Sequence, residues 1–558
     1  MATHTAIFFY YVYQPGRANA YATSRRKIVI PMIKTFMVVL AIAASSLPGF
    51  SQAKITSGAG YEAVETRDTH YFSRSGDILA VKIVEEGKSV VIQKVNATTL
   101  KLKSAKTYDD LPKGSEVELV TRVGDKFYVL YSDKEGKTDL LFAREIDFAK
   151  GVFKGVGKKI ITEEKGIAKV HDPESMNKMK AADKYTFTYS RDSALLAIHY
   201  PMKTEHLDYY KDPYAIGMHV FDGNLNRQWE SEATLPYIHK RISVFDFGLD
   251  TKGNLYMLAQ ITSDDELQDD NFLLFKFGSD GQAKPMKVTT GSKYLIDALL
   301  VGKPDGSMLC AGYFTNSSPL RAYGMATFET KDDGTLTEYR TTDIPSEIRN
   351  LHSSADRKAK NITDGDRNFA GLKLKHVELM NDGSIVMVGD QNFIETNAEY
   401  TRRANGNGST SQNWHVAHSN DILITKVDAS GKLAWINRLP KRQESYTPDL
   451  YAMSFAYVQG NNAHYMFFLD NADNKVLDLK AVPERHINDL GGFLTAYVVS
   501  DATGAPSRLS ILDTRNVDGT QIAHFAPQRL LVTAPNTIVF ECFKKKTGDL
   551  FVKIELAK

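Results

Sequence analysis

The feature that most constrains the fold is a repeat unit, seen most clearly in residues 242–290. This segment holds four short runs of apolar or alternating residues. Two of the turns between them read Lys252-Gly-Asn254 and Ser279-Asp-Gly281. Such runs, bounded by Gly, Asp and Asn, are typical of strands joined by hairpins. We therefore interpret the segment as a unit of four antiparallel strands.

The turn between the first and second strands of this unit recurs along the chain. Eight copies are found, at residues 75–77, 123–125, 190–192, 252–254, 304–306, 381–383, 460–462 and 534–536. Each precedes an apolar strand, and the Gly, Asp and Asn residues in these turns tolerate left-handed backbone. Repeated four-stranded units predict an all-β fold, a β-propeller of eight blades. Seven blades is the alternative, because the first strand of copy one, at residues 70–73, is weak.

The chain stops after the third strand of the eighth copy, so one strand is missing there. Residues 61–66 precede the first copy, and we expect them to supply it. Pairing the N-terminal and C-terminal strands closes the ring and removes exposed sheet edges.

Residues 1–53 have the composition of a secretory signal peptide. A basic segment precedes an apolar run that starts at Met32, and small residues follow up to Ser51-Gln-Ala53, where we expect cleavage. We therefore predict an exported protein in the periplasm, at the cell surface or outside the cell. An uncleaved anchor is the alternative, but the uncharged run at 35–50 is short for a span of about 20 residues. Met32 as the true start, with 1–31 as a mis-annotated extension, also stays open.

Residues 54–558 are predicted to form a single propeller domain without an integral membrane span. Residues 1–53 hold five of the 69 basic residues and none of the 67 acidic ones, so the remainder has 64 basic and 67 acidic residues, a net charge of −3. This charge does not fit a nucleic-acid partner, which needs a basic surface. Cys310 and Cys542 lie in separate apolar strands and are predicted to be buried free thiols.

Insertions interrupt the repeat, and long loops on a rigid propeller are where binding usually resides. They lie near residues 172–182, 204–213, 344–371, 397–419 and 470–489. The first is predicted to be helical, with Asp172 as N-cap and Pro173 at the first position. The insertion at 397–419 is predicted to be the longest irregular run.

Aromatic and imidazole side chains in two insertions are the candidate contacts for a protein or glycan ligand. They are Tyr209, Tyr210, Trp414, His415 and His418. Two His three positions apart beside a Trp also suit a metal or ligand contact, but no third ligand stands at a recognisable spacing. An exposed loop is the alternative, and no metal site is predicted.

No cofactor is predicted, and calcium is the alternative. Residues 364–368 resemble the first half of a calcium loop, but Phe369 and Lys375 replace the Gly and Glu that such a loop needs. Residues 264–270 form an acidic loop that is more typical of a solvated turn.

The segment Val427-Asp-Ala-Ser-Gly-Lys-Leu-Ala-Trp435 resembles the hairpin motif of quinoprotein-like eight-bladed propellers, and Asp222 and Trp229 repeat its Asp-to-Trp spacing. The resemblance implies that each Trp docks one blade against the next. The adjacent cysteine pair of the quinone dehydrogenases is missing from the sequence, which argues against that redox activity. Residues 60–558 are also similar to exported bacterial β-propellers with WD40-like repeats, a resemblance that brings no activity with it.

The sequence contains no Gly-x-Ser-x-Gly, no His-Glu-x-x-His and no phosphate-binding Gly-rich loop. Catalytic residues are therefore not assigned. The predicted function is an exported, non-catalytic propeller that binds a protein or glycan through its loop face. The alternative is a hydrolase or lyase acting on a polysaccharide or peptide, with carboxylates or His in the central channel. The two differ in whether acids cluster in one pocket of the channel. The oligomeric state stays open.

Overall fold

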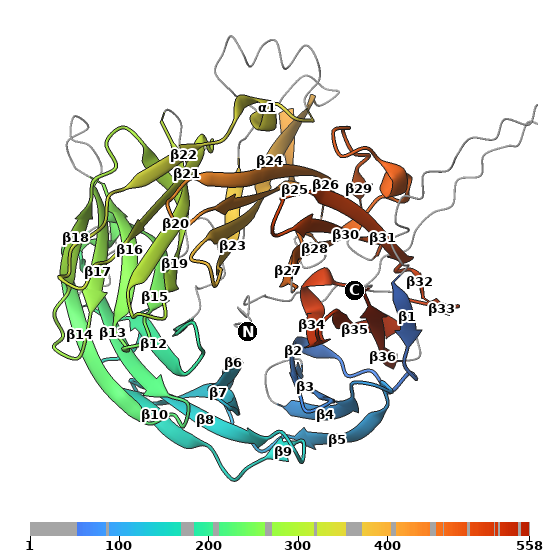
Figure 1. The fold of residues 1–558 in the computed structure, drawn as a ribbon. Helices are drawn as coiled ribbons and strands as arrows, with labels where there is room; N and C mark the ends of the chain where they lie inside the picture. Colours follow the sequence, from blue (N-terminus) through green and yellow to red (C-terminus); the bar gives the residue numbers. More distant parts are fainter. Residues whose placement is uncertain are drawn as a thin grey trace, which may run out of the picture.

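Eight four-stranded antiparallel sheets are arranged around a central channel in the computed structural model, so the chain is an eight-bladed β-propeller (Figure 1). The structure describes residues 53–84, 89–168, 184–204, 211–262, 271–316, 321–352, 371–402, 409–446, 453–460, 462–487, 491–517, 519–522, 525–544 and 548–556. The predicted signal peptide up to residue 52, the predicted helix at 172–182, Tyr209, Tyr210, the acidic segment at 264–270 and the calcium-like segment at 364–369 lie outside these residues.

The first four blades follow one another along the chain. Blade one consists of β2 (Thr66–Arg74), β3 (Asp77–Val84), β4 (Val90–Asn96) and β5 (Leu102–Tyr108). Blade two consists of β6 (Glu116–Val123), β7 (Lys126–Glu135), β8 (Thr138–Asp147) and β10 (Lys158–Glu163), with β9 (Val152–Phe153) on β8. Blade three consists of β11 (Thr186–Tyr189), β12 (Leu195–Pro201), β13 (Pro213–Asp222) and β14 (Arg227–Ile238). Blade four consists of β15 (Ile242–Leu249), β16 (Leu255–Ile261), β17 (Asn271–Phe277) and β18 (Lys284–Val288).

The last four blades carry the larger additions. Blade five consists of β19 (Tyr294–Gly302), β20 (Met308–Thr315), β21 (Gly324–Glu329) and β22 (Arg340–Asp343). Blade six consists of β23 (Leu372–Leu379), β24 (Ile385–Arg402), β25 (Ser409–Val427) and β26 (Leu433–Ser445), with β29 (His486–Ile487) at its edge. Blade seven consists of β27 (Ala456–Gln459), β28 (Ala463–Asp470), β30 (Phe493–Ser500) and β31 (Pro506–Asp513). Blade eight consists of β34 (Leu530–Ala534), β35 (Thr537–Lys544), β36 (Gly548–Glu555) and β1 (Lys54–Ser57).

Few described residues lie in other elements. They form the one-turn helix α1 (Ser346–Arg349), the 3-10 turns η2 (His239–Arg241), η3 (Ala472–Val476) and η4 (Pro527–Arg529), and the ribbon of β32 (Asn516–Val517) and β33 (Thr520–Gln521). None of the helices among the described residues is long and apolar enough to cross a membrane.

The predicted closure by the two chain ends is confirmed, but the strand prediction was wrong. β1 pairs antiparallel with β36, with Lys54 opposite Glu555 and Ser57 opposite Val552. The expected segment at 61–66 contributes only one isolated bridge, Tyr61 to Asp549. Lys54–Ser57 alternates and adds a hydrogen-bonded edge strand, whereas Tyr61 turns inward to bury its ring beside Phe551.

The core consists of eight clusters of buried apolar side chains, one between each pair of neighbouring blades. Both faces of every blade are therefore buried, which explains why the second strands read as continuous apolar runs. Cys310 and Cys542 are buried in β20 and β35 as free thiols, as predicted. Seven blades is excluded, because the weak first strand of copy one is the nine-residue strand β2.

Several of the predicted turns adopt left-handed backbone. Gly253 and Gly306 have φ of 84° and 85° at the turns between the first and second strands of blades four and five. A residue with a Cβ is strained at such angles, so glycine sets the tight turn there.

Candidate functional site

The central channel is lined by the first strand of each blade, and six of these strands carry a bulge. The pairing register with the second strand shifts in β2, β6, β15, β19, β23 and β34. A bulge re-aims the side chains beside it. Asp68, Asp246, Asp297 and His376 each stand directly after a bulge.

Two of these carboxylates join neighbouring blades. Asp246 Oδ2 accepts the backbone N–H of Leu300 in blade five at 2.7 Å, and Asp297 Oδ2 accepts that of Leu374 in blade six at 2.7 Å. Burial raises the pKa of Asp246 to about 7, and the neighbouring charge of Asp297 adds to the effect. Burial also raises the pKa of Asp297 above its usual range. Two channel acids with a raised pKa are what the hydrolase or lyase alternative requires. Each of them, however, also forms a hydrogen bond that joins one blade to the next.

Asp246→Asn is expected to stabilise the protein at alkaline pH. Because the pKa of Asp246 is higher in the folded state than in the unfolded state, folding favours the protonated carboxyl. Its contribution to the free energy of unfolding is therefore complete below pH 4 and is lost as the pH rises toward 7. The neutral amide keeps an acceptor for Leu300 N–H. Urea midpoints should show a gain of about 2–4 kcal/mol at pH 8 and little change at pH 4.

The matched control is Asp68→Asn on β2. Asp68 stands after the corresponding bulge. Burial opposes ionisation of its carboxyl, but His70 Nε2 at 2.8 Å, the Thr69 N–H and Arg529 together hold its pKa below the usual range. Loss of that charge should destabilise the protein at pH 8. An equal gain for Asp246→Asn at both pH values contradicts the assignment.

The turn of blade three reaches across the channel. Arg191 Nη2 donates to Leu379 O of blade six at 2.5 Å and lies 3.5 Å from Glu378 Oε1. Ser190, beside it, forms a parallel bridge with Leu249 of blade four. Blades three and six are not neighbours in the ring (Figure 1), so the hydrogen bond of Arg191 connects two blades across the channel.

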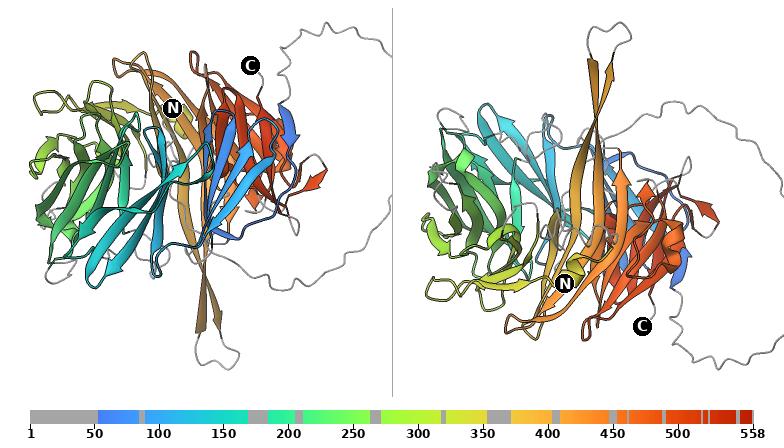
Figure 2. Two further views of the ribbon diagram at one scale, coloured as in Figure 1. Left: turned by 90° about the horizontal axis from the view of Figure 1, so that it is seen from below. Right: turned by 90° about the horizontal axis from the view of Figure 1, so that it is seen from above.

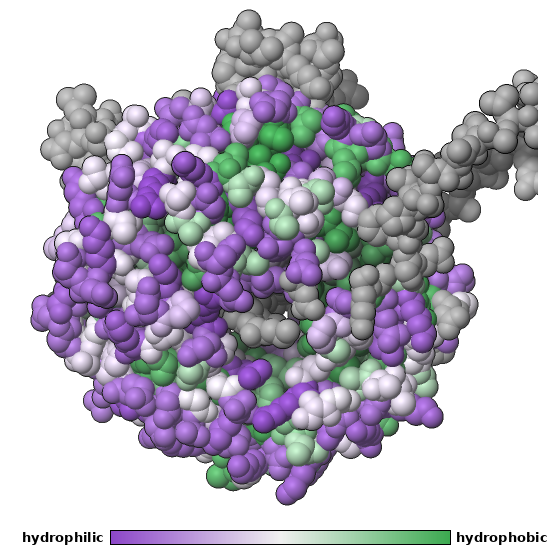
Figure 3. All heavy atoms as spheres, viewed as in Figure 1, coloured by the Kyte–Doolittle hydropathy of each residue, from purple (hydrophilic) through white to green (hydrophobic). Residues whose placement is uncertain are grey.

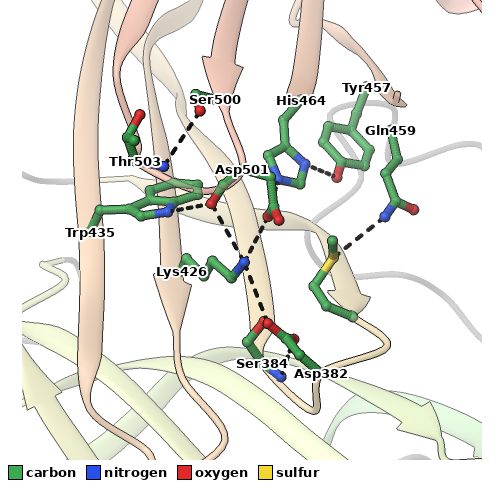
Figure 4. A network of polar contacts seen from close by, with 11 residues as sticks. Asp382, Ser384, Lys426, Trp435, Tyr457, Gln459, His464, Ser500, Asp501 and Thr503 are labelled. Atoms are coloured by element: carbon green, nitrogen blue, oxygen red, sulfur yellow. Dashed lines mark hydrogen bonds and ion pairs between the residues drawn. The ribbon is translucent and has the colours of Figure 1, made fainter. Parts of the chain in front are cut away.

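A polar network lies between blades six and seven (Figure 4). Trp435 Nε1 donates to Asp501 O at 2.9 Å, and Lys426 Nζ lies 2.8 Å from Asp501 Oδ1. His464 joins Asp501 Oδ1 through Nε2 at 3.0 Å and the Tyr457 hydroxyl through Nδ1 at 2.8 Å. Burial lowers the pKa of His464, although Asp501 opposes the effect.

A shallow pocket of about 470 Å³ opens beside this network, lined by Asp382, Lys426, Trp435 and Thr503 among others. Trp435 docks blade six on blade seven, and Trp229 Nε1 docks blade three on blade four by donating to Gly253 O at 2.8 Å. Both tryptophans therefore make the blade-to-blade contact that the hairpin resemblance implies. The hydrogen bonds of the network are directed within the protein, which indicates a structural role.

Blade six carries a long hairpin that projects from the ring (Figure 2). β24 and β25 pair from Ile385 with Val427 out to Arg402 with Ser409, whereas β23 pairs with β24 only as far as Gln391. We call residues 392–402 and 409–416 the arm. The prediction of an irregular run at 397–419 was wrong over residues 397–402 and 409–419, which are strand. Polar residues dominate 395–402, so the sequence there lacks the apolar alternation of a half-buried strand.

Buried charges hold the base of the arm. Asp390 and Lys441 are both 0% exposed, and Asp390 Oδ2 lies 3.1 Å from Lys441 Nζ. Ser419 and Ser454 each donate a hydroxyl to the same carboxylate oxygen at 2.7 Å. Burial opposes ionisation of Asp390, but Lys441 and these donors still hold its pKa below the usual range. We call Asp390, Lys441, Ser419 and Ser454 the base cluster.

A second buried group adjoins the base cluster. Asp421 Oδ2 accepts from Arg438 Nε at 2.8 Å and lies 2.7 Å from His352 Nδ1. His352 Nε2 lies 2.8 Å from Leu479 O in the insertion of blade seven. The arm is therefore anchored to the segment after α1 and to blade seven, so it leaves the ring in a fixed direction.

Two of the candidate ligand-binding residues, His415 and His418, lie on β25 and make separate contacts with β24. His418 stacks on Phe393, with ring centroids 4.7 Å apart, and its Nε2 lies 3.2 Å from Glu395 Oε2. His415 is exposed, and its Nδ1 lies 3.0 Å from Thr396 Oγ1. Trp414 belongs to β25 and pairs in register with Asn397. In the described part of the chain, no three His, Cys, Asp or Glu residues could together hold a metal ion.

Exposed apolar side chains gather around the base of the arm. Nine large apolar side chains of the described residues are exposed, and six belong to blades six and seven: Phe393, Ile394, Tyr446, Val476, Val482 and Ile487. We call these six the apolar rim. Figure 3 draws the face of the ring opposite to the one from which the arm projects, and that face is mostly hydrophilic, with hydrophobic areas toward the top of the view.

Strand pairing places part of the apolar rim in one row. Phe393, His418, Glu444 and Ile487 are register partners across β24, β25, β26 and β29. Val476 is 95% exposed in the insertion that leads to β29. Sequence reasoning missed Phe393 and Ile394, although a Phe-Ile pair just outside an apolar strand was a signal that could have found them.

No protein-family model and no curated protein sequence match the chain. Among solved structures, it is similar to the polysaccharide lyase Uly1, with 9% identity over 92% of this chain and 94% of that chain and a TM-score of 0.32. It is also similar to the β-propeller domain of the Trilobed protease from Pyrococcus furiosus, with 9% identity, 84% and 98% coverage and a TM-score of 0.33. An oligogalacturonate lyase in complex with manganese gives 11% identity, 80% and 97% coverage and a TM-score of 0.31. Likeness at this level carries no argument about activity.

Proposed function

We propose that this protein is an exported β-propeller that binds a partner protein through the arm and the apolar rim. The main evidence is that two features occur together in blade six. A projecting hairpin is fixed by buried charges, and six of the nine exposed large apolar side chains lie around its base or in the neighbouring insertion. Contiguous exposed apolar side chains mark protein-binding surfaces more often than isolated ones do.

A protein partner fits this surface better than a glycan. Phe393, Ile394, Val482 and Ile487 are aliphatic or phenyl groups at the surface. Aliphatic side chains gain binding energy by burial against other apolar surface, at about 25 cal/mol per Å². Sugar sites instead rely on flat aromatic rings combined with hydrogen-bonding groups. Export is part of the proposal because of the composition of residues 1–53, and N-terminal sequencing of the purified protein tests it.

Photo-cross-linking in the native envelope tests the binding surface. A photoreactive residue at position 393 or 394 is expected to give one discrete adduct, and the same residue in place of Leu102 in blade one is not. Leu102 and Phe393 are both 38% exposed, so they are matched in accessibility. Adducts of equal yield and identity at both positions, or none at the arm, overturn the proposal.

The double variant Phe393→Ser with Ile394→Ser is expected to weaken the captured complex about 100-fold, because two apolar side chains lose roughly 1.5 kcal/mol each. Affinity is measured with the cross-linked partner once it has been identified by mass spectrometry. Leu102→Ser serves as the control and should leave the affinity unchanged. If the double variant keeps full affinity, the apolar rim is not part of the interface.

Acid chemistry in the channel is the second candidate, favoured by the Asp246 carboxyl with its pKa of about 7 and by Asp297 on the next strand. A group with that pKa suits general acid or base catalysis near neutral pH. A panel of acidic polysaccharides and peptides is assayed with the unmodified protein, Asp246→Asn and Asp297→Asn. An activity lost about 100-fold in both variants supports this candidate, and no turnover, or turnover that both variants keep, rejects it.

A further inference from the structure

We propose that the outer edge of β24, from residue 394 to residue 402, accepts an extended segment of a partner protein as a third strand of the arm. The inference rests on the proposed function and specifies how the partner binds. Strand addition of this kind uses main-chain hydrogen bonds for affinity and side-chain pockets for specificity.

The first observation is that this edge is not paired within the described part of the chain. β23 pairs with β24 from Leu379 opposite Ile385 to Leu372 opposite Gln391, and no described strand continues beyond that point. β25 occupies the other edge of β24 along its whole length. An unpaired edge of this length is a template for another chain.

The second observation identifies which amide groups face outward. Asn392 N–H donates to Gly371 O at 2.7 Å, on the side away from β25. Along a strand, the N–H and C=O groups of successive residues point alternately to the two sides. The amides of residues 394, 396, 398 and 400 therefore face outward, and those of residues 393, 395, 397 and 399 face β25.

The third observation is that two of the usual edge-protection devices are missing. Residues 392–402 contain no Pro and no Lys, although Glu395, Glu399 and Arg402 place charge on the strand. Blade six already accepts one additional strand, because β29 adds to β26 at Gln443 and Glu444.

The side chains near the base of this edge indicate the chemistry of the occupant. Phe393 and Ile394 are exposed on opposite faces of β24, and Glu395 is 55% exposed. Residues 394–402 contain two glutamates, Glu395 and Glu399, and one basic residue, Arg402, which lies at the far end of the edge. An extended segment that alternates apolar and basic side chains complements this edge.

The test uses an acetylated and amidated octapeptide of alternating Lys and Val, with hydrogen exchange resolved to single residues in the full chain. Exchange at the outward amides of residues 394, 396, 398 and 400 is expected to slow at least 10-fold. Exchange at residues 393, 395 and 397 should not change, because those amides already bond to β25. Protection without this alternation, or no protection at millimolar peptide, overturns the inference. Equal protection by a Glu-Val peptide overturns the assigned charge of the occupant.

A matched pair of variants removes one backbone group. Thr396→Pro deletes an outward N–H and leaves the bonds to β25 intact, since proline is tolerated on an edge whose N–H faces solvent. Thr396→Val keeps the N–H and removes the same hydroxyl contact with His415. In the proline variant, the peptide should no longer slow hydrogen exchange at the outward amides, whereas in the valine variant it should. Equal slowing in both variants contradicts the inference.

Two further outcomes separate the alternatives. Native cross-links at position 393 that persist in Thr396→Pro leave the proposed function standing and reject strand addition. A sedimentation shift from dimer to monomer between the unmodified protein and Thr396→Pro, without peptide, shows that a second copy fills the edge, and the proposal of a partner segment then fails.

Discussion

Lys82→Met should lower the free energy of unfolding by about 3–5 kcal/mol, because it leaves buried carboxylates without their counter-charge. Lys82 is 1% exposed, and its Nζ lies 2.8 Å from Glu541 Oε1 and 2.6 Å from Asp549 Oδ2. Tyr61 and Tyr71 both donate hydroxyl hydrogen bonds to Glu541. Burial opposes ionisation of Glu541, but Lys82 and these hydroxyls hold its pKa below the usual range.

This cluster joins blade one to blade eight, where the ring closes. The effect is measured as a shift of the urea or guanidinium midpoint of residues 54–558. Lys103→Met is the control in the same blade, since Lys103 is 44% exposed and pairs with Asp77 at the surface. An exposed ion pair contributes about 0–1 kcal/mol. Similar midpoint shifts for the two variants would contradict the assigned importance of the closure cluster.

Lys441→Met is expected to lower stability by about 3–5 kcal/mol as well, and in this case the loss concerns the base of the arm. Lys441 Nζ contacts Asp390 Oδ2 at 3.1 Å and Ser419 O at 3.0 Å. Without the ammonium group, Asp390 remains buried and charged. Hydrogen exchange in β24 and β25 should therefore rise in the variant.

The double variant Asp390→Asn with Lys441→Met distinguishes charge from packing. A neutral pair removes the uncompensated charge, so the double variant should be more stable than Lys441→Met alone, with a coupling of roughly 1–3 kcal/mol. Additive losses would show that Lys441 acts through packing. The cross-linking yield at position 393 should follow the stability of the base cluster, because the arm presents the apolar rim.

The strand architecture could be predicted from the sequence because the turns carry a local signal. Gly and Asn at positions with positive φ, such as Gly253 and Asn536, mark the ends of strands whatever surrounds them. The repeat of these turns then gives the number of blades. Closure by the chain ends followed from counting strands, although the choice between Lys54–Ser57 and residues 61–66 depended on where Tyr61 could be buried.

The functional region was only partly predictable. His415 and His418 pointed to blade six, but the sequence showed no apolar alternation that distinguishes a free-standing hairpin from a loop. The partners of Asp390 and Asp246 stand on other strands, with Lys441 51 residues away and Leu300 54 residues away. Such contacts exist only after the blades have assembled, so no local pattern encodes them.

The pairing of β1 with β36 also sets an order of assembly. Lys54–Ser57 is translated long before its partner strand, Gly548–Glu555. The first strand must therefore wait, unpaired, until almost the whole chain has been synthesised. Seven blades can form as the chain lengthens, but the eighth sheet is complete only after residues 548–555 have been translated. A truncation anywhere within the last strand thus leaves an otherwise assembled ring open at this seam, with unpaired edges that promote aggregation.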